Sequence, residues 1–177
     1  MAWSTPLTAV SNTALTAAQW NASMRDDMLE TPAAKFTAAG QMFISTAANA
    51  GAVRVPQMAA IATLETTTST SYTDLATPGP AVGGLVSGTQ ALIGLHTYSN
   101  HGTTGVPALM SFAVSGATTL AAADAFAVGM EGTNGCRVGT MELVTGLTAG
   151  TNTFTAKYRT ISGTATFQAR RLTVVPL

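Results

Sequence analysis

The chain has 177 residues, of which only 9% are charged, and its 8 Lys and Arg residues balance 8 Asp and Glu residues to a formal net charge of zero. This balance leaves no electrostatic footprint for phosphate, which argues against nucleic acid as a partner, and the scarcity of repulsive charges favours association into an assembly. The single cysteine, Cys136, excludes an internal disulfide framework, and the sequence has neither an apolar run long enough to span a bilayer nor the pattern of a secretory signal.

The first predicted element is a helix within residues 13–31. The sequence "TAAQ", which begins at Thr16, matches a capping box in which the Thr16 side chain caps the helix and Gln19 reaches back to the Thr16 backbone. Pro32 is predicted to end this helix, because a proline disfavours helical backbone in the residue before it.

This predicted helix carries one apolar stripe. Trp20, Met24 and Met28 recur every four residues, and Leu15 precedes the stripe at a position where it can pack on Trp20. A helix of roughly fourteen residues is marginal on its own in water, so the stripe is expected to dock on a partner. Arg25 lies beside the stripe and is expected to act at that interface.

Residues 32–56 are predicted to form an extended arm. Two short candidate strands, 41–45 and 52–55, are separated by Ala, Asn and Gly, and the segment has too little apolar content for its own core. We therefore expect the arm to pair with neighbouring chains. The helix and the arm together make a predicted attachment region at residues 1–58, followed by a head domain at residues 59–177.

The head domain is predicted to be an antiparallel β-sandwich. Short apolar or alternating runs recur there, each bounded by turn residues, and no helical period interrupts them. The candidate strands are 61–66, 81–86, 91–98, 108–115, 125–131, 136–145, 152–160 and 165–175. Eight such strands in two sheets predict a jelly roll or a close relative. Asn134-Gly135 is expected to be the turn of a hairpin between two of them.

Alternation assigns faces to the last two predicted strands. Phe154 and Tyr158 are expected on one face of their strand, and in the last strand Phe167 is expected on the face opposite to Arg170. Arg170 and Arg171 are predicted to form cross-strand or subunit ion pairs with one of three acids: Asp124, Glu131 and Glu142.

The N-terminal text resembles the opening of structural proteins from tailed bacteriophages and prophages. The elements that carry the resemblance are Trp3, Thr5-Pro6, Leu15-Thr16-Ala17, Asn21 and Arg25-Asp26. The segment "KFTAAGQMFISTAANAGAVRVP" is similar to a part of phage fibre and spike proteins, although Gly40-Gln41 stands where those proteins usually have Gly-Asp. The ending "GLTAGTNTFTAKYR…TATFQARRLTVVPL" is similar to the closing strands of their compact β-sandwich heads.

The resemblance covers both ends of the chain, about half of it in all. It implies a virion structural protein of the head-decorating, head-fibre or tail-associated spike type, commonly a trimer. It also implies the major capsid protein or other virion proteins as partners, and a location on the exterior of the particle.

Candidate catalytic groups are sparse. Asp26, Asp27 and Glu30 lie within one and a half helical turns, but neighbouring side chains on a helix diverge by about 100°, so they do not converge on a cation. Cys136 has no sequence-adjacent base that would make it a nucleophile. We therefore expect no catalytic residue, no metal and no cofactor, and the chain is predicted not to be an enzyme.

The sequence "HTYSNHG" is the most chemically varied segment and is interpreted as a loop. Its aromatic and amide groups suit recognition of a sugar, whereas a metal site needs at least one more ligand than the segment offers. A plain structural loop and a ligand-binding loop both stay open. The candidate ligand residues are His96, Tyr98, Asn100 and His101.

The sequence thus predicts a non-enzymatic virion protein that assembles as an oligomer, with a trimer favoured, and is anchored by its N-terminal region. The residues predicted to dock on the partner are Trp3, Leu15, Trp20, Met24, Arg25 and Met28. The alternative is a receptor-binding or glycan-binding module of a tail fibre or tail tip, with a host-surface glycan as the ligand.

Overall fold

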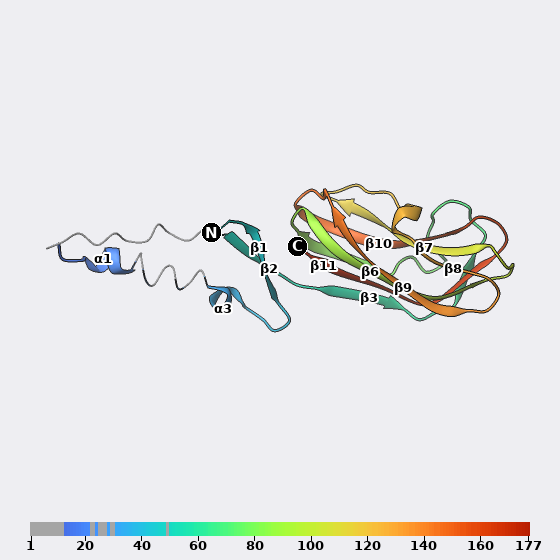
Figure 1. Cartoon of the computed structure of the whole chain (residues 1–177), viewed down its shortest axis with the longest axis horizontal. Helices are drawn as coiled ribbons and strands as arrows, with labels where there is room; N and C mark the ends of the chain where they lie inside the picture. The colour runs from blue at the N-terminus through green and yellow to red at the C-terminus, as the bar shows by residue number, and fades with distance from the viewer. Residues whose placement is uncertain (1–12, 22–23, 25–27, 29–30, 49) are drawn as a thin grey trace. The chain divides into compact units, whose positions relative to one another are not determined.

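The structure is a computed structural model, and it describes residues 13–21, 24, 28, 31–48 and 50–177 (Figure 1). The chain divides into two compact units, Met1–Val55 and Pro56–Leu177, called unit 1 and unit 2 below. Within the described ranges, none of the helices has the length and apolar character needed to cross a membrane.

Unit 1 contains the predicted helix cap. Helix α1 (Ala17–Trp20) begins after Thr16, whose side-chain oxygen accepts a hydrogen bond from the Gln19 backbone N–H at 3.2 Å. The Gln19 side-chain oxygen in turn accepts from the Thr16 backbone N–H at 2.9 Å, so the capping box is confirmed.

The Thr31 backbone is extended, as predicted for the residue before Pro32. Pro32 itself occupies the first position of a further short helix, α3 (Pro32–Lys35), with Thr31 as its N-cap. A proline is well tolerated there, because the backbone N–H that it lacks has no partner at that position and its fixed φ suits a helix. The Thr31 hydroxyl donates to the Met28 carbonyl at 2.9 Å.

The segment predicted to be an extended arm forms a β-hairpin within the chain. Strand β1 (Met42–Ala47) pairs antiparallel with β2 (Ala50–Arg54), and this two-stranded sheet includes no other strand of the described chain. The Phe43 ring lies over Gly51, where any side chain would displace it. No described residue of unit 1 is buried, so the hairpin has no core beneath it. The expected pairing with neighbouring chains stays a prediction.

Unit 2 is a jelly roll of two antiparallel sheets. One sheet has the order β5-β10-β7-β8 and the other has the order β3-β11-β6-β9, with β4 also pairing with β11. The strands are β3 (Gln57–Ile61), β4 (Glu65–Thr67), β5 (Ala81–Ser87), β6 (Gln90–His101), β7 (Pro107–Gly116), β8 (Val128–Glu131), β9 (Cys136–Thr145), β10 (Gly150–Thr160) and β11 (Ala165–Pro176). A short 3₁₀ helix, η2 (Asp124–Phe126), precedes β8.

The path of the chain gives this strand order. From β5 to β11 the chain changes sheet at every connection except that between β7 and β8, which pair with each other. Figure 1 shows the result as two layers, with β7 and β10 in one and β3, β6 and β11 in the other. The predicted mainly-β, jelly-roll-like sandwich is confirmed.

The core lies between the two sheets and follows the two-residue period of the strands. On β10, Phe154, Ala156 and Tyr158 are fully buried, as the alternation predicted. The Tyr158 ring packs against Phe167 of β11, with 4.9 Å between ring centroids, and so joins the two sheets. The other fully buried large apolar side chains are Ile93, Leu95, Met110, Phe112, Leu172 and Val174.

Three sequence predictions about strands are wrong. Asn134-Gly135 is not a hairpin turn, because the strands on either side of it, β8 and β9, belong to different sheets. The expected strand 61–66 is two strands, β3 and β4. The strict alternation of β11 fails at a bulge between Gln168 and Arg171, where Ala169 has a φ of 50°. The bulge puts Arg170 on the buried side together with Phe167.

Candidate functional site

The predicted docking residues that the structure describes are all exposed. Leu15 is 49% exposed, Trp20 54%, Met24 47% and Met28 66%. Trp3 and Arg25 lie outside the described residues. Exposed aromatic and thioether side chains in one short segment are typical of a surface that meets a partner.

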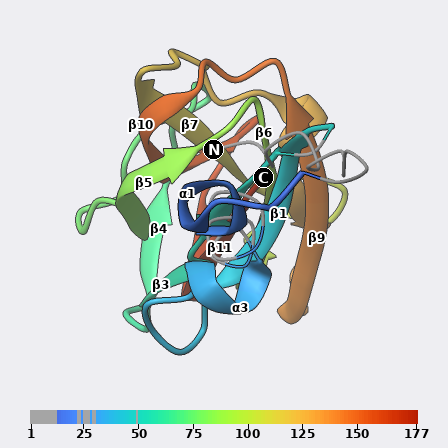
Figure 2. The same cartoon turned by 90° about the vertical axis from the view of Figure 1, so that its left-hand side faces the viewer.

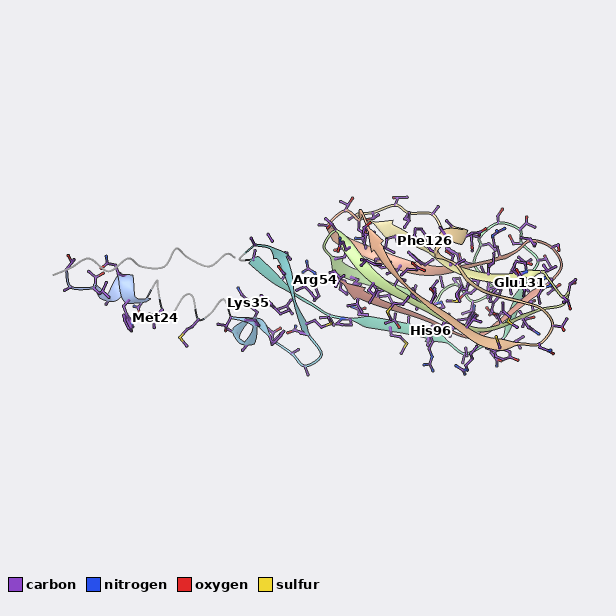
Figure 3. All side chains as sticks on the ribbon, in the orientation of Figure 1. Met24, Lys35, Arg54, His96, Phe126 and Glu131 are labelled. Atoms are coloured by element: carbon purple, nitrogen blue, oxygen red, sulfur yellow. The ribbon has the colours of Figure 1, made fainter. Side chains whose placement is uncertain are left out.

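The segment predicted to be a ligand loop is the end of strand β6. Its alternation places His96, Tyr98 and Asn100 on the outer face of the sheet and turns His101 inward. The loop prediction is therefore wrong: the chain leaves the strand only after His101. In Figure 3, His96 lies on one side of unit 2 and Phe126 on the opposite side, against the other sheet.

His101 is a structural residue. It is completely buried, its Nδ1 accepts a hydrogen bond from the Thr103 backbone N–H at 2.9 Å, and its Nε2 lies 2.7 Å from the Ser162 carbonyl. These contacts use both ring nitrogens to join two loops, so His101 has no free polar atom for a ligand.

The outer face of the sheet β3-β11-β6-β9 holds a pocket of about 350 Å³. Its lining residues come from four strands and are Met58, His96, Thr97, Arg137, Val138, Gly139, Arg171 and Thr173. His96 lies at the centre, paired in register with Arg171 of β11 on one side and with Gly139 of β9 on the other. No carboxylate lines the pocket. Figure 2 shows β9 at the edge of this sheet.

The cations of unit 2 fall into two groups. Lys157 pairs with Asp74 at 2.7 Å, Arg170 pairs with Glu65 at 2.9 Å, and Arg159 pairs with Asp124. Arg137 and Arg171, by contrast, have no carboxylate partner within the described part of the chain. Both unpaired arginines line the pocket on the outer face of the sheet. The prediction that Arg170 pairs with Asp124, Glu131 or Glu142 is wrong, since the bulge turns it toward Glu65.

The pair of Arg170 and Glu65 lies under the edge of the sandwich. Arg170 has no exposed side-chain surface and Glu65 only 11%. The Thr77 hydroxyl and backbone N–H donate to Glu65 at 2.6 and 3.0 Å and, together with Arg170, hold the pKa of that carboxyl below its ordinary value. The Arg170 guanidinium also lies 5.4 Å from the centroid of the buried Tyr158 ring. The carboxylate is fixed in its ionised form, which suits a structural role.

A second hollow, of about 620 Å³, contains a cluster that the sequence did not reveal. Oδ1 of Asp124 accepts hydrogen bonds at 2.8 Å from the Tyr72 hydroxyl and from Nε of Arg159. Oδ2 of Asp124 accepts a hydrogen bond from a terminal guanidinium nitrogen of Arg159. These bonds, that from Arg159 first, lower the pKa of Asp124. Burial, followed by the hydrogen bond to Asp124, raises the pKa of Tyr72 to about 12. Tyr72 and Arg159 lie 52 and 35 residues from Asp124 in the chain, so no local pattern signals the cluster.

Metal-binding and thiol chemistry have little geometric support in the described residues. No three His, Cys, Asp or Glu side chains among them gather into a group that could hold a metal ion. Cys136 is a half-buried free thiol whose sulfur lies 3.2 Å from the sulfur of Met130.

Comparison with models of protein families and with curated protein sequences finds no match. Among solved structures, the Eiger TNF of S. frugiperda is 10% identical over 69% of this chain and 92% of its own, with a TM-score of 0.46. A structure of the Gx strain of infectious bursal disease virus is 11% identical over 75% of this chain and 37% of its own, with a TM-score of 0.45. The C-terminal CBM6 of the laminarinase LamC from Zobellia galactanivorans is 14% identical over 76% and 88%, with a TM-score of 0.33. Likeness this distant carries no argument on function.

Proposed function

We propose that this chain is a non-enzymatic structural protein on the exterior of a tailed-phage particle. Unit 1 attaches it to the major capsid protein or another virion protein, and unit 2 is the exposed head. The observation that carries the proposal is the contrast in burial: unit 2 closes a core between two sheets, whereas no described residue of unit 1 is buried. The proposed assembly is a homotrimer.

The exposed side chains of unit 1 explain why it needs a partner. Each Å² of apolar surface that is removed from water contributes about 25 cal/mol of stabilising free energy. Trp20 and Met28 leave more than half of their surface in water. The capping box fixes where helix α1 begins, and Trp20 is the last residue of that helical turn. A surface on the partner that covers these side chains supplies the stabilisation that unit 1 lacks.

The ion pairs of unit 2 support a role without catalysis. Three of its carboxylates, Glu65, Asp74 and Asp124, are each held by a cation. A general acid needs a raised pKa, whereas the pKa values of Glu65 and Asp124 are lowered. Paired carboxylates of this kind stabilise connections between strands.

The particle assignment draws on sequence motifs. The text from Trp3 to Asp26 resembles the opening of tailed-phage structural proteins, and the segment that begins at Lys35 is similar to a part of phage fibre and spike proteins. Those motifs fall in unit 1, the unit that also holds the exposed side chains of Leu15, Trp20 and Met28. The low charge of the whole chain agrees with a subunit that exists within an assembly.

Light scattering after size exclusion, combined with limited proteolysis, tests this function. We expect the purified chain to have three times the mass of one chain, and the free hairpin β1–β2 to be cleaved well before unit 2. A stable monomer whose residues 13–55 resist protease would contradict the proposal. A structure of the phage particle that contains this chain would then show which virion protein unit 1 contacts.

A second function, recognition of a host-surface glycan by unit 2, is favoured by one observation. The outer face of the sheet β3-β11-β6-β9 carries a pocket beside His96 with polar and apolar lining. His101 is buried and takes no part, and of the three predicted ligand residues on the outer face only His96 lines the pocket, whereas Tyr98 and Asn100 lie outside it. Loss of binding to host cells in a His96→Ala variant that keeps its fold would support this function, and unchanged binding would contradict it.

A further inference from the structure

The pocket on the outer face of the sheet is lined by positively charged side chains and by no negatively charged one. Arg137 and Arg171 both line it, both are exposed, and no acidic side chain shares the lining. The three other cations of unit 2 have carboxylate partners. In a chain where only 9% of residues are charged, two unpaired guanidinium groups in one pocket are a specific arrangement.

The strand register fixes the groups around this pocket. His96 is flanked by Arg171 and Gly139, and Arg137 pairs with Tyr98, the next outward residue of β6. Neighbouring strands are about 4.8 Å apart, so the two arginines stand on either side of His96. The His96 ring lies over Gly139, where a Cβ would collide with it, and this glycine therefore keeps the ring flat against the sheet.

The lining indicates the kind of ligand. A volume of about 350 Å³ exceeds the roughly 30 Å³ of a water molecule many times over, so the pocket has room for a ring in addition to an anionic group. Met58 and Val138 offer apolar surface to the C–H face of such a ring, and Thr173 offers a hydroxyl. Planar guanidinium groups match the two oxygens of a carboxylate.

We propose that this pocket binds an acidic saccharide, with its carboxylate between Arg137 and Arg171 and its ring against His96 and Met58. Nucleic acid is disfavoured as the ligand, because two arginines on a chain of zero net charge neutralise too few phosphates. The inference rests on the second proposed function, glycan recognition, and is independent of attachment through unit 1. It names the chemical class of the glycan and adds Arg137, Arg171 and Met58 to its site.

Nuclear magnetic resonance titration of the full chain tests the proposal. The probes are methyl glucuronide, its neutral counterpart methyl glucoside, and inorganic phosphate. We expect the glucuronide to shift the backbone amides of Arg137, Gly139 and Thr173 in a saturable way, with the glucoside and phosphate much weaker. Arg137→Gln and Arg171→Gln should each weaken glucuronide binding by about tenfold or more.

Two further variants test whether binding depends on where the positive charge lies and on the orientation of the His96 ring. Lys157→Gln removes the same charge from the other sheet and should leave binding unchanged. Gly139→Ala keeps both arginines but displaces the His96 ring, and it should weaken binding while the unfolding transition stays near that of the parent chain.

Each contrary outcome overturns a defined part of the proposal. Equal shifts with the glucoside would keep glycan recognition but remove the acidic class. Equal shifts with phosphate would identify a site for a bare oxyanion and overturn the saccharide. Failure of all three probes to shift the pocket would overturn the acidic saccharide, whereas glycan recognition itself is decided separately by host-cell binding of the His96→Ala variant. If the Arg variants then also changed the oligomeric mass, the pocket would belong to a contact between copies of the chain.

Discussion

The two units of the chain use β-structure in opposite ways. Unit 2 winds its strands into two sheets that bury Phe112, Phe154 and Phe167 between them. The described part of unit 1 has one hairpin, whose Phe43 ring rests on a glycine, and none of its described residues is buried. An isolated two-stranded hairpin is only marginally stable in water, whereas a closed sandwich supports itself. The difference separates a unit with its own core from one that, under the proposed function, depends on a partner for its order.

The largest contrast should come from removing one phenyl ring in each unit. Phe154→Ala opens a cavity in the core and should lower the free energy of unfolding by about 3 to 5 kcal/mol. Phe36→Ala removes a ring that is 42% exposed and should change the same quantity by less than about 0.5 kcal/mol. Urea unfolding followed by circular dichroism measures both. Similar losses in the two variants would contradict the division into a self-supporting and a dependent unit.

The buried ion pair of unit 2 should have the next largest effect. Glu65→Gln leaves the Arg170 guanidinium buried without its counter-charge and should cost about 3 kcal/mol of unfolding free energy. Asp74→Asn, a matched loss of a carboxylate at the more exposed pair with Lys157, should cost less than about 1 kcal/mol. Equal costs measured by urea unfolding would show that burial of Arg170 is energetically unimportant.

Acid should weaken unit 2 through the same carboxylates. The folded-state pKa values of Glu65 and Asp124 are lowered, so their stabilisation is complete above the unfolded values of about 4 and is lost as pH falls through the folded values. The urea midpoint should therefore hold steady from neutral pH to about pH 5 and drop below about pH 4. The Glu65→Gln variant should show a smaller drop, and an identical drop would contradict the assignment.

The smallest effect on stability should come from Trp20. Trp20→Ala alters an exposed side chain of unit 1 and should leave the unfolding of unit 2 unchanged within about 0.5 kcal/mol. It should nevertheless abolish incorporation of the chain into the particle, as measured by the protein content of purified particles. Tyr72→Phe, which removes the hydroxyl of a half-buried side chain of unit 2, is the control and should incorporate normally.

Much of the fold could be predicted from short sequence patterns, because strand alternation and helix capping depend on interactions between residues close together in the chain. The alternation around Phe154 and Tyr158 and the capping box at Thr16 were both recoverable from a few neighbouring residues. The sheet that a strand joins was not recoverable, which is why Asn134-Gly135 was taken for a hairpin turn. The bulge at Ala169 inserts one residue and so moves Arg170 to the other face, a change that no two-residue period predicts.

The candidate sites were less predictable than the strands. The pocket draws His96, Arg137 and Arg171 from three strands that meet only in the folded sheet. His96 was singled out because it lies in a varied segment, whereas the two arginines had no local signal. His101 was also singled out, and only its inward position on β6 reveals its structural role. Exposed apolar side chains in unit 1, by contrast, were visible as a helical stripe.

Amide hydrogen exchange, measured on the free chain and on the assembled particle, shows whether unit 1 depends on a partner for its order. We expect strong protection of β6, β7, β10 and β11 in both states, and protection of β1 and β2 only in the particle. Slow exchange of β1 and β2 in the free chain, at the level of β11, would contradict the claim that unit 1 depends on a partner for its order.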